Sequence, residues 1–325
     1  MRTLAKVTGL ALALMAGAAS AQSLETLVAT AAEPVTIESV ARGADGSLIL
    51  SSVWLGRLYR AEADGRLTTL LEADPEMGFY GLAADPDRGV LYAVSAERPS
   101  RTGAKGTSLL KIDLATGAVL DRATPEAPAH RFGDVAVGPD GSAYVADLRG
   151  VRIFVWRPGQ ALATLAVLPE RASPQGMAVS PNGRWLILAD YRTGLHRIDL
   201  AAAAQGPLTL TAESYQPLTP PDAGELRGID GLARRGDTIL AMQNGTQTHR
   251  VLRVTMNPDW SAITGRETLH EGAPLDDPTT GFVEGDSLIF VSRSQWSDFN
   301  LDGAKTPTPA PAVVSRLPLI PETRP

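Results

Sequence analysis

The chain has 325 residues, 30 Lys and Arg against 36 Asp and Glu, a net charge of −6, and no cysteine. The absence of cysteine excludes a disulfide scaffold and a lipid anchor on cysteine. An acidic chain with scattered basic residues is a poor candidate for nucleic-acid binding, which needs a basic patch.

The first residues have the features of a secretory signal. A basic start, Met-Arg-Thr-Leu-Ala-Lys, is followed by the apolar run Val7–Ala18 and by Ala19-Ser20-Ala21. This order predicts a signal peptide over Met1–Ala21 and export to a bacterial periplasm. The alternative, a membrane anchor, requires a run of about 20 apolar residues, and this run is shorter. No later run reaches that length, so no membrane association is expected after cleavage.

From Glu38 onward one phrase returns along the chain. It is clearest at Arg131–Trp156, where three short apolar runs are separated by Pro, Asp and Gly turns, a pattern typical of antiparallel strands. The copies begin 42 to 55 residues apart, at Glu38, Tyr80, Gly133, Gln175, Asp230 and Thr279. A period near 40–50 residues predicts an all-β fold, a six-bladed β-propeller formed as one domain by residues 22–325. A seven-bladed ring and an open sandwich are the alternatives.

The last copy predicts how the ring closes. Ser287–Ser292 and Val313–Pro318 resemble second and third strands, separated by a Pro-rich linker at residues 304–312, and no fourth strand follows. The N-terminal stretch Leu24–Val28 resembles the fourth strand of the fifth copy, so we expect it to complete the sixth blade. In the fourth copy the fourth strand is expected at Leu208–Ala212.

Polar residues precede the first strand of each copy and follow the second. In a propeller these two positions meet at one mouth of the central channel, where Glu38, Asp134 and Asp230 would converge. Oxygen ligands of this kind suit a hard cation. For Asp190 and Asp147, at the ends of second strands, capping of the following turn is the alternative. The four histidines show no zinc-ligand spacing, and packing or surface roles are expected for them.

Four segments resemble the regucalcin–gluconolactonase family: Glu38-Ser-Val-Ala, Arg131-Phe-Gly-Asp134, Ser173-Pro-Gln-Gly176 and Ile229-Asp-Gly-Leu232. The resemblance implies a six-bladed propeller that hydrolyses sugar lactones with one divalent metal in its channel. Glu38 and Asp230 match the metal-binding Glu and Asp of that family. Gln175 replaces an Asn, and Gly133 stands where a second Asn is expected, so the metal site differs from the family pattern.

The functional prediction is a metal-dependent hydrolase of a lactone or related ester. Glu38, Asp230 and Gln175 would hold one divalent cation, with Ca²⁺ as the first choice and Mg²⁺, Mn²⁺ or Zn²⁺ as alternatives. Asp134 or Asp230 would be the general base. Substrate contacts are expected from Tyr80, Arg131, Asp190, Gln243, Asn244, Gln295 and Trp296.

There are two alternatives. One is a non-catalytic propeller that binds a small molecule or a partner through the same rim and has a degraded metal site. The other is a carbon–carbon bond-forming propeller similar to strictosidine synthase. A small-molecule substrate or ligand is expected, and a monomer is expected because the outer strands are short.

Overall fold

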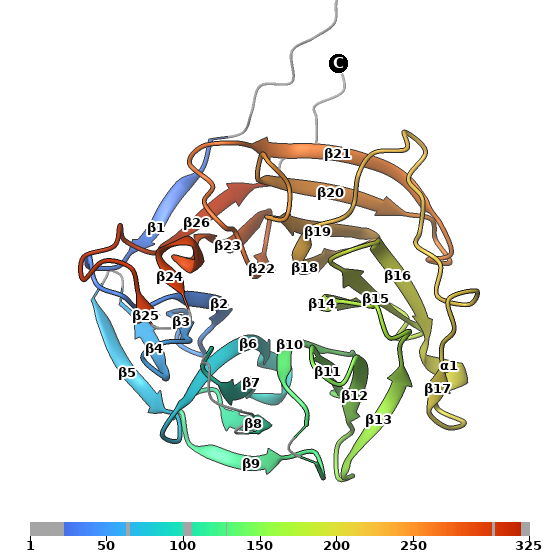
Figure 1. Cartoon of the computed structure of the whole chain (residues 1–325), viewed down its shortest axis with the longest axis horizontal. Helices are drawn as coiled ribbons and strands as arrows, with labels where there is room; N and C mark the ends of the chain where they lie inside the picture. Colours follow the sequence, from blue (N-terminus) through green and yellow to red (C-terminus); the bar gives the residue numbers. More distant parts are fainter. Residues whose placement is uncertain (1–22, 63–65, 100–105, 128, 301–302, 320–325) are drawn as a thin grey trace, which may run out of the picture.

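The computed structural model describes residues 23–62, 66–99, 106–127, 129–300 and 303–319. The predicted signal peptide, Met1–Ala21, lies outside the described residues. Six sheets are arranged around a central axis as the blades of a propeller (Figure 1), which confirms the predicted fold.

The first three blades follow the chain in order. Blade one contains β2 (Ile37–Arg42), β3 (Leu48–Ser52), β4 (Arg57–Ala61) and β5 (Leu67–Glu72). Blade two contains β6 (Met77–Asp85), the 3-10 turn η1 (Pro86–Arg88), β7 (Val90–Glu97), β8 (Thr107–Asp113) and β9 (Val119–Ala123). Blade three contains β10 (Phe132–Val137), β11 (Ala143–Asp147), β12 (Arg152–Trp156) and β13 (Leu162–Val167).

The remaining blades are less uniform. Blade four contains β14 (Pro174–Val179), β15 (Trp185–Asp190) and β16 (Gly194–Asp199), followed by helix α1 (Leu200–Ala203). Blade five contains β18 (Ile229–Arg235), β19 (Thr238–Gln243), β20 (Arg250–Met256) and β21 (Ile263–Glu271). Blade six contains β22 (Gly281–Glu284), β23 (Ser287–Arg293), β26 (Val313–Pro318) and β1 (Glu25–Ala29). The 3-10 turn η2 (Trp296–Asp298) and the hairpin of β24 (Phe299–Asn300) and β25 (Gly303–Ala304) lie between β23 and β26.

The N-terminal strand closes the ring, as predicted. β1 runs antiparallel to β26, with Glu25 opposite Arg316 and Ala29 opposite Val313. Gln295, beside the hairpin, adds a second tie, because its Oε1 accepts hydrogen bonds from the backbone N–H groups of Val35 and Thr36. The edge of the last sheet is therefore covered by the start of the chain.

Blade four differs from the prediction, which placed its fourth strand at Leu208–Ala212. The strand β17 (Leu208–Thr209) instead pairs in parallel with β13, on the outer edge of blade three. Asp199 caps α1 by accepting from the N–H groups of Ala201 and Ala202, and the alanine run that follows favours a helical turn. The helix directs the chain away from β16, so the next strand reaches the neighbouring blade.

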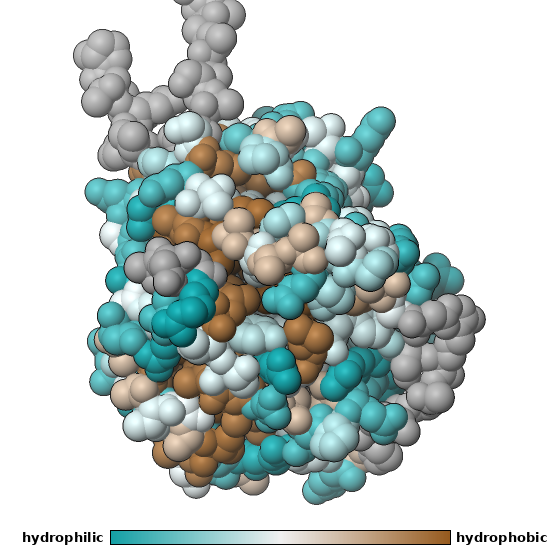
Figure 2. Space-filling view, turned by 90° about the vertical axis from the view of Figure 1, so that its left-hand side faces the viewer, coloured by the Kyte–Doolittle hydropathy of each residue, from teal (hydrophilic) through white to brown (hydrophobic). Residues whose placement is uncertain are grey.

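The core lies between the blades. The described core residues form six clusters, one at each boundary between neighbouring blades; one of them joins Tyr144 and Val155 of blade three to Leu186 and Leu188 of blade four. Seen from the side that carries the first and last blades, apolar side chains reach the surface among polar ones (Figure 2). In the described part of the chain, no helix has the length and apolarity needed to span a membrane.

Closure can be tested at Val28, which is 4% exposed and packs with residues of blades six and one. We expect Val28→Ala to lower the free energy of unfolding by about 2 kcal/mol, because it leaves a cavity at the closing strand. Thr26→Ala, on the exposed face of the same strand, is the control and should stay within about 0.5 kcal/mol. Urea unfolding measures both values, and equal values would argue against a stabilising role for β1.

Candidate functional site

The inner strands of the first five blades all contain an irregular register near their start. In blade one, Ile37 pairs with Ser52 and Ser39 with Ser51, which leaves Glu38 without a partner on β3. In blade five, Asp230 is left in the same way between Ile229 and Gly231. Register shifts at the equivalent places of the other three blades contain the pairs Tyr80-Gly81, Gly133-Asp134 and Gln175-Gly176. A bulge of this kind turns side chains out of the regular alternation, here toward the channel.

These residues line one cavity at a mouth of the channel. Its volume is about 680 Å³, which is in the range of small-molecule sites. Of the predicted site residues, it brings together Glu38, Tyr80, Arg131, Asp134, Gln175, Asp230, Asn244 and Trp296. Sequence reasoning missed other lining residues, among them Leu148, Arg149, Tyr191, Asp277 and Thr280.

Three carboxyl groups in the cavity have raised pKa values. Enclosure in the channel raises the pKa of Glu38 to about 8; the negative charge of Asp230 adds to this effect, and the indole N–H of Trp296 opposes it. Enclosure also raises the pKa of Asp134 to about 7, although the backbone N–H of Val135 stabilises its charged form. For Asp230 the pKa rises to about 6, because enclosure outweighs the hydrogen bond from Asn244. These carboxyls can therefore exchange protons near neutral pH.

Neighbouring side chains orient Asp230. The Nδ2 of Asn244 donates to Asp230 Oδ2 at 2.7 Å and to the carbonyl of Pro278 at 3.1 Å. The hydroxyl of Tyr191 donates to Asn244 Oδ1 at 2.9 Å, which fixes the orientation of the amide. One oxygen of Asp230 is thus held by the neutral amide of Asn244, which lies in the turn after β19 of blade five.

Three predicted substrate contacts are not among the residues that line the cavity. Asp190 accepts from the N–H groups of Ser173, Arg192 and Thr193, and from the hydroxyl of Tyr215. Gln243 donates to the carbonyls of Glu225 and Arg227. Gln295 holds the segment before β2 and donates to the carbonyls of Glu33 and Ala310. Each side chain is buried and holds a turn or loop by its hydrogen bonds.

Gly133 has a specific reason to lack a side chain. A Cβ built on Gly133 would lie 2.8 Å from Cδ1 and Cγ of Leu148. Leu148 itself lines the cavity, directly after the buried Asp147 at the end of β11. An apolar side chain therefore occupies the space next to the position where the family pattern has an Asn.

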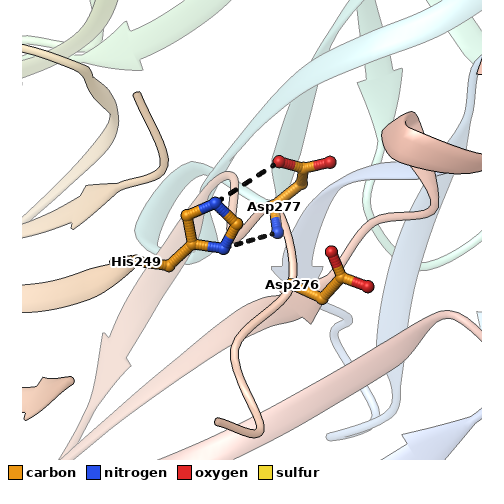
Figure 3. A group of neighbouring side chains, drawn as sticks. All are labelled: His249, Asp276 and Asp277. Carbon is orange, nitrogen blue, oxygen red and sulfur yellow. Dashed lines mark hydrogen bonds and ion pairs between the residues drawn. The ribbon is translucent and has the colours of Figure 1, made fainter. Parts of the chain in front are cut away.

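A second group of metal-ligand type lies beside the cavity. His249, Asp276 and Asp277 place one ligand atom each within 4.8 Å of one another (Figure 3). His249 Nδ1 accepts from the backbone N–H of Asp277 at 3.1 Å, and Asp276 forms an ion pair with Arg293. His249 is therefore close to two acids, which its isolated position in the sequence did not indicate. The doublet Asp276-Asp277, shortly before an inner strand, was the available signal.

The other end of the channel is chemically different. A cavity of about 380 Å³ there is lined mainly by aliphatic residues of the inner strands, with Arg42, Arg234 and Glu284 among its polar residues. Asp134 and Thr280 line both cavities. Acid chemistry is thus concentrated at the end that contains Glu38 and Asp230.

The pH dependence of stability tests this electrostatic description. The pKa of Glu38 is higher in the folded protein than its usual value of 4.5, so the stability associated with its proton is present below about pH 4.5 and is lost as pH rises through about 8. In chelator-treated protein, Glu38→Gln should therefore gain melting temperature relative to wild type between about pH 5 and pH 8. Glu72→Gln, on the exposed edge of β5, is the matched control. A constant difference between Glu38→Gln and wild type at all pH values would contradict the raised pKa.

Comparison with known proteins places the fold. No protein-family model matches the chain, and no curated protein matches its sequence. A calcium-binding regucalcin from Agrobacterium tumefaciens aligns with TM-score 0.59 and 20% identity, over 91% of this chain and 93% of that one. A gluconolactonase from Xanthomonas campestris aligns with TM-score 0.56 and 17% identity, over 95% and 94%. The PQQ-bound aldose sugar dehydrogenase of Streptomyces coelicolor aligns with TM-score 0.61 and 17% identity, over 91% and 98%. Regucalcin and gluconolactonase structures are thus structural neighbours of this chain, and the resemblance is confirmed at the level of the six-bladed fold.

Proposed function

We propose that this protein is a periplasmic hydrolase of lactones or related esters that acts at the polar mouth of its channel. The observation that carries the proposal is the convergence of Glu38, Asp134 and Asp230, from three blades, on one cavity where their pKa values lie near neutrality. The fold shared with gluconolactonase structures supports it. The leader-like sequence of Met1–Ala21 supports the location, and a monomer is the proposed state.

Asp134 is suited to the role of general base. Its carboxylate is stabilised by the backbone N–H groups of Val135 and Met177, and its pKa of about 7 matches proton transfer near neutral pH. It would take a proton from a water molecule whose oxygen attacks the lactone carbonyl carbon. The ring C–O bond then breaks, the ring oxygen receives the proton, and the product is a hydroxy acid. Tyr80 and Arg131, also in the cavity, would position the sugar ring.

The donor set fits a hard divalent cation. One oxygen of Glu38 and one of Asp230 accept from Trp296 and Asn244, and the second oxygen of each accepts no hydrogen bond from the residues that the structure describes. Gln175 lines the same cavity and adds an amide oxygen. Glu38, Asp230 and Gln175 would therefore hold the cation, with Ca²⁺ as the first choice because its ligands are oxygens. When bound, such an ion polarises a carbonyl and lowers the pKa of a water molecule.

A non-catalytic, ligand-binding propeller is the second candidate. The observation that favours it is Leu148, which fills the space over Gly133 and leaves the cation with fewer protein ligands. Fold does not decide between the two candidates, because the same architecture supports unrelated activities. Lactone hydrolysis and cation binding separate the two candidates.

Activity is tested first with a panel of sugar and aliphatic lactones, and hydrolysis is measured by the protons it releases. We expect Asp134→Asn to lower kcat at least about a hundredfold, since it removes the base. In the wild type, kcat should rise with pH through about 7 as Asp134 loses its proton. Glu284→Gln, an acid at the opposite end of the channel, is the control and should keep wild-type activity. Full activity in Asp134→Asn would exclude the proposed base.

Cation binding is tested by thermal unfolding of chelator-treated protein with added Ca²⁺, Mg²⁺, Mn²⁺ or Zn²⁺. A cation present at a hundred times its Kd should stabilise the folded state by about 2.7 kcal/mol. We expect Asp230→Asn to abolish this gain and Glu284→Gln to retain it. If no cation stabilises the wild type, the metal part of the proposal fails and the ligand-binding candidate gains support. If Asp276→Asn alone abolishes the gain, the ion binds beside His249 instead.

A further inference from the structure

Arginine side chains from two blades line the wall of the cavity beside Tyr80. Arg98, Arg131 and Arg149 are lining residues, and Glu97 is the acid among them. The Nη2 of Arg149 donates to Glu97 Oε1, and the Nε of Arg131 lies 3.9 Å from the same oxygen. Three cations and one anion leave this wall with a positive formal charge. We call Glu97, Arg98, Arg131 and Arg149 the arginine wall.

The guanidinium of Arg131 is held before any ligand arrives. It lies over the ring of Tyr80, 5.0 Å from the centroid, and its Nη2 donates to the Tyr80 hydroxyl at 3.0 Å. The same hydroxyl donates to the carbonyl of Glu97 at 2.8 Å. A guanidinium fixed in this way pays little conformational entropy when it binds an anion.

Glu97 shows what these arginines recognise. Its side chain is 7% exposed, and two guanidinium groups from another blade converge on its Oε1. Its second oxygen, Oε2, is buried and has no hydrogen-bond partner in the described part of the chain. Arg149 remains 40% exposed at the cavity, so it retains donors for a second carboxylate.

We propose that Arg131 and Arg149 form a carboxylate-binding subsite, and that the substrate is a lactone carrying a free carboxylate, such as a lactone of a sugar diacid. The reaction part of this inference rests on the proposed function, whereas the binding part depends on the arginine wall alone. The carboxylate would bind at the wall and place the lactone carbonyl toward Glu38, Asp134 and Asp230 across the same cavity. A neutral lactone would leave the arginine donors without a partner, which is how a polar site rejects an analogue.

The test uses ligand pairs that differ only in one terminal group. D-glucaric and D-gluconic acid γ-lactones, closed at the same ring position, are compared for kcat/KM, and glucuronate and glucose are compared for Kd by calorimetry. In each pair we expect wild type to prefer the member that carries the free carboxylate by about tenfold or more, the usual effect of a charge-assisted hydrogen bond. Arg149→Gln should remove this preference. Glu97→Gln should increase it, because it neutralises the competing carboxylate.

Arg122→Gln provides the matched control, since Arg122 is also a partly exposed arginine paired with an acid, Asp74, but lies on the outer strand of blade two. It should keep the wild-type preference. Melting temperatures and circular dichroism establish that each variant is folded, and Glu97→Gln tests the inference in the opposite direction if Arg149→Gln unfolds.

The outcomes separate the two proposals. Preferential binding of glucuronate over glucose that Arg149→Gln removes, without hydrolysis of either lactone, would uphold the subsite and overturn the hydrolase. Hydrolysis of both lactones with equal kcat/KM, unchanged in Arg149→Gln and Glu97→Gln, would uphold the hydrolase and overturn the subsite.

Discussion

The chemistry of this propeller depends on one backbone feature, the irregular register near the start of its inner strands. A regular strand would alternate its side chains between two blade interfaces, and both are apolar. The bulge at Glu38 and Asp230 leaves one residue outside that alternation, so a carboxylate can enter the channel while its neighbours stay in the core. Gly81 leaves room for Asp134 of the next blade, because a Cβ on Gly81 would lie 2.5 Å from Asp134 Oδ1. Residues that build the core and residues that line the cavity therefore lie within a few positions of each other on the same strand.

The cavity brings together groups that repel or compete. Enclosure raises the pKa of Glu38, Asp134 and Asp230. The charge of Asp230 further raises the pKa of Glu38 and of Asp134, while Trp296 and Asn244 stabilise particular carboxylate oxygens. The arginine wall lies at the same mouth and acts on the same groups, since the positive charge of Arg131 lowers the pKa of Glu38. A ligand with charged or polar groups therefore fits this mouth of the channel better than the opposite end, which is lined mainly by aliphatic residues. Acidic residues in the channel have a cost in stability that a bound ion or a proton can offset.

Much of the fold could be predicted from the sequence, because each blade repeats the same turns and apolar runs. Glu38, Gln175 and Asp230 could be predicted for the same reason, because they occupy one position of the repeat, and Asp134 lies next to that position. Blade four departed where Asp199 and an alanine run started a helix, a local preference that the repeat does not contain. Arg149 and Leu148 could not be placed, since the orientation of side chains in a turn has no period. His249 and Asp276 lie close together because the strands of blades five and six are neighbours in the propeller, which the sequence alone did not indicate. Hydrogen bonds to nearby turns hold Asp190 and Gln243 outside the cavity lining, and the spacing of residues does not reveal such bonds.

Ring closure by β1 also constrains the order in which the chain can fold. The bond from Arg316 to Glu25 joins residues 291 positions apart, whereas the strands within blades one to five are neighbours in sequence. Local blades can form as the chain is synthesised, but the first strand must wait for nearly the last residues to appear. The contact that completes the ring therefore carries the largest loop-closure entropy and should form late. Until then the free edge of β26 and the unpaired N-terminal strand are exposed together, which makes this junction the place where two copies could exchange strands.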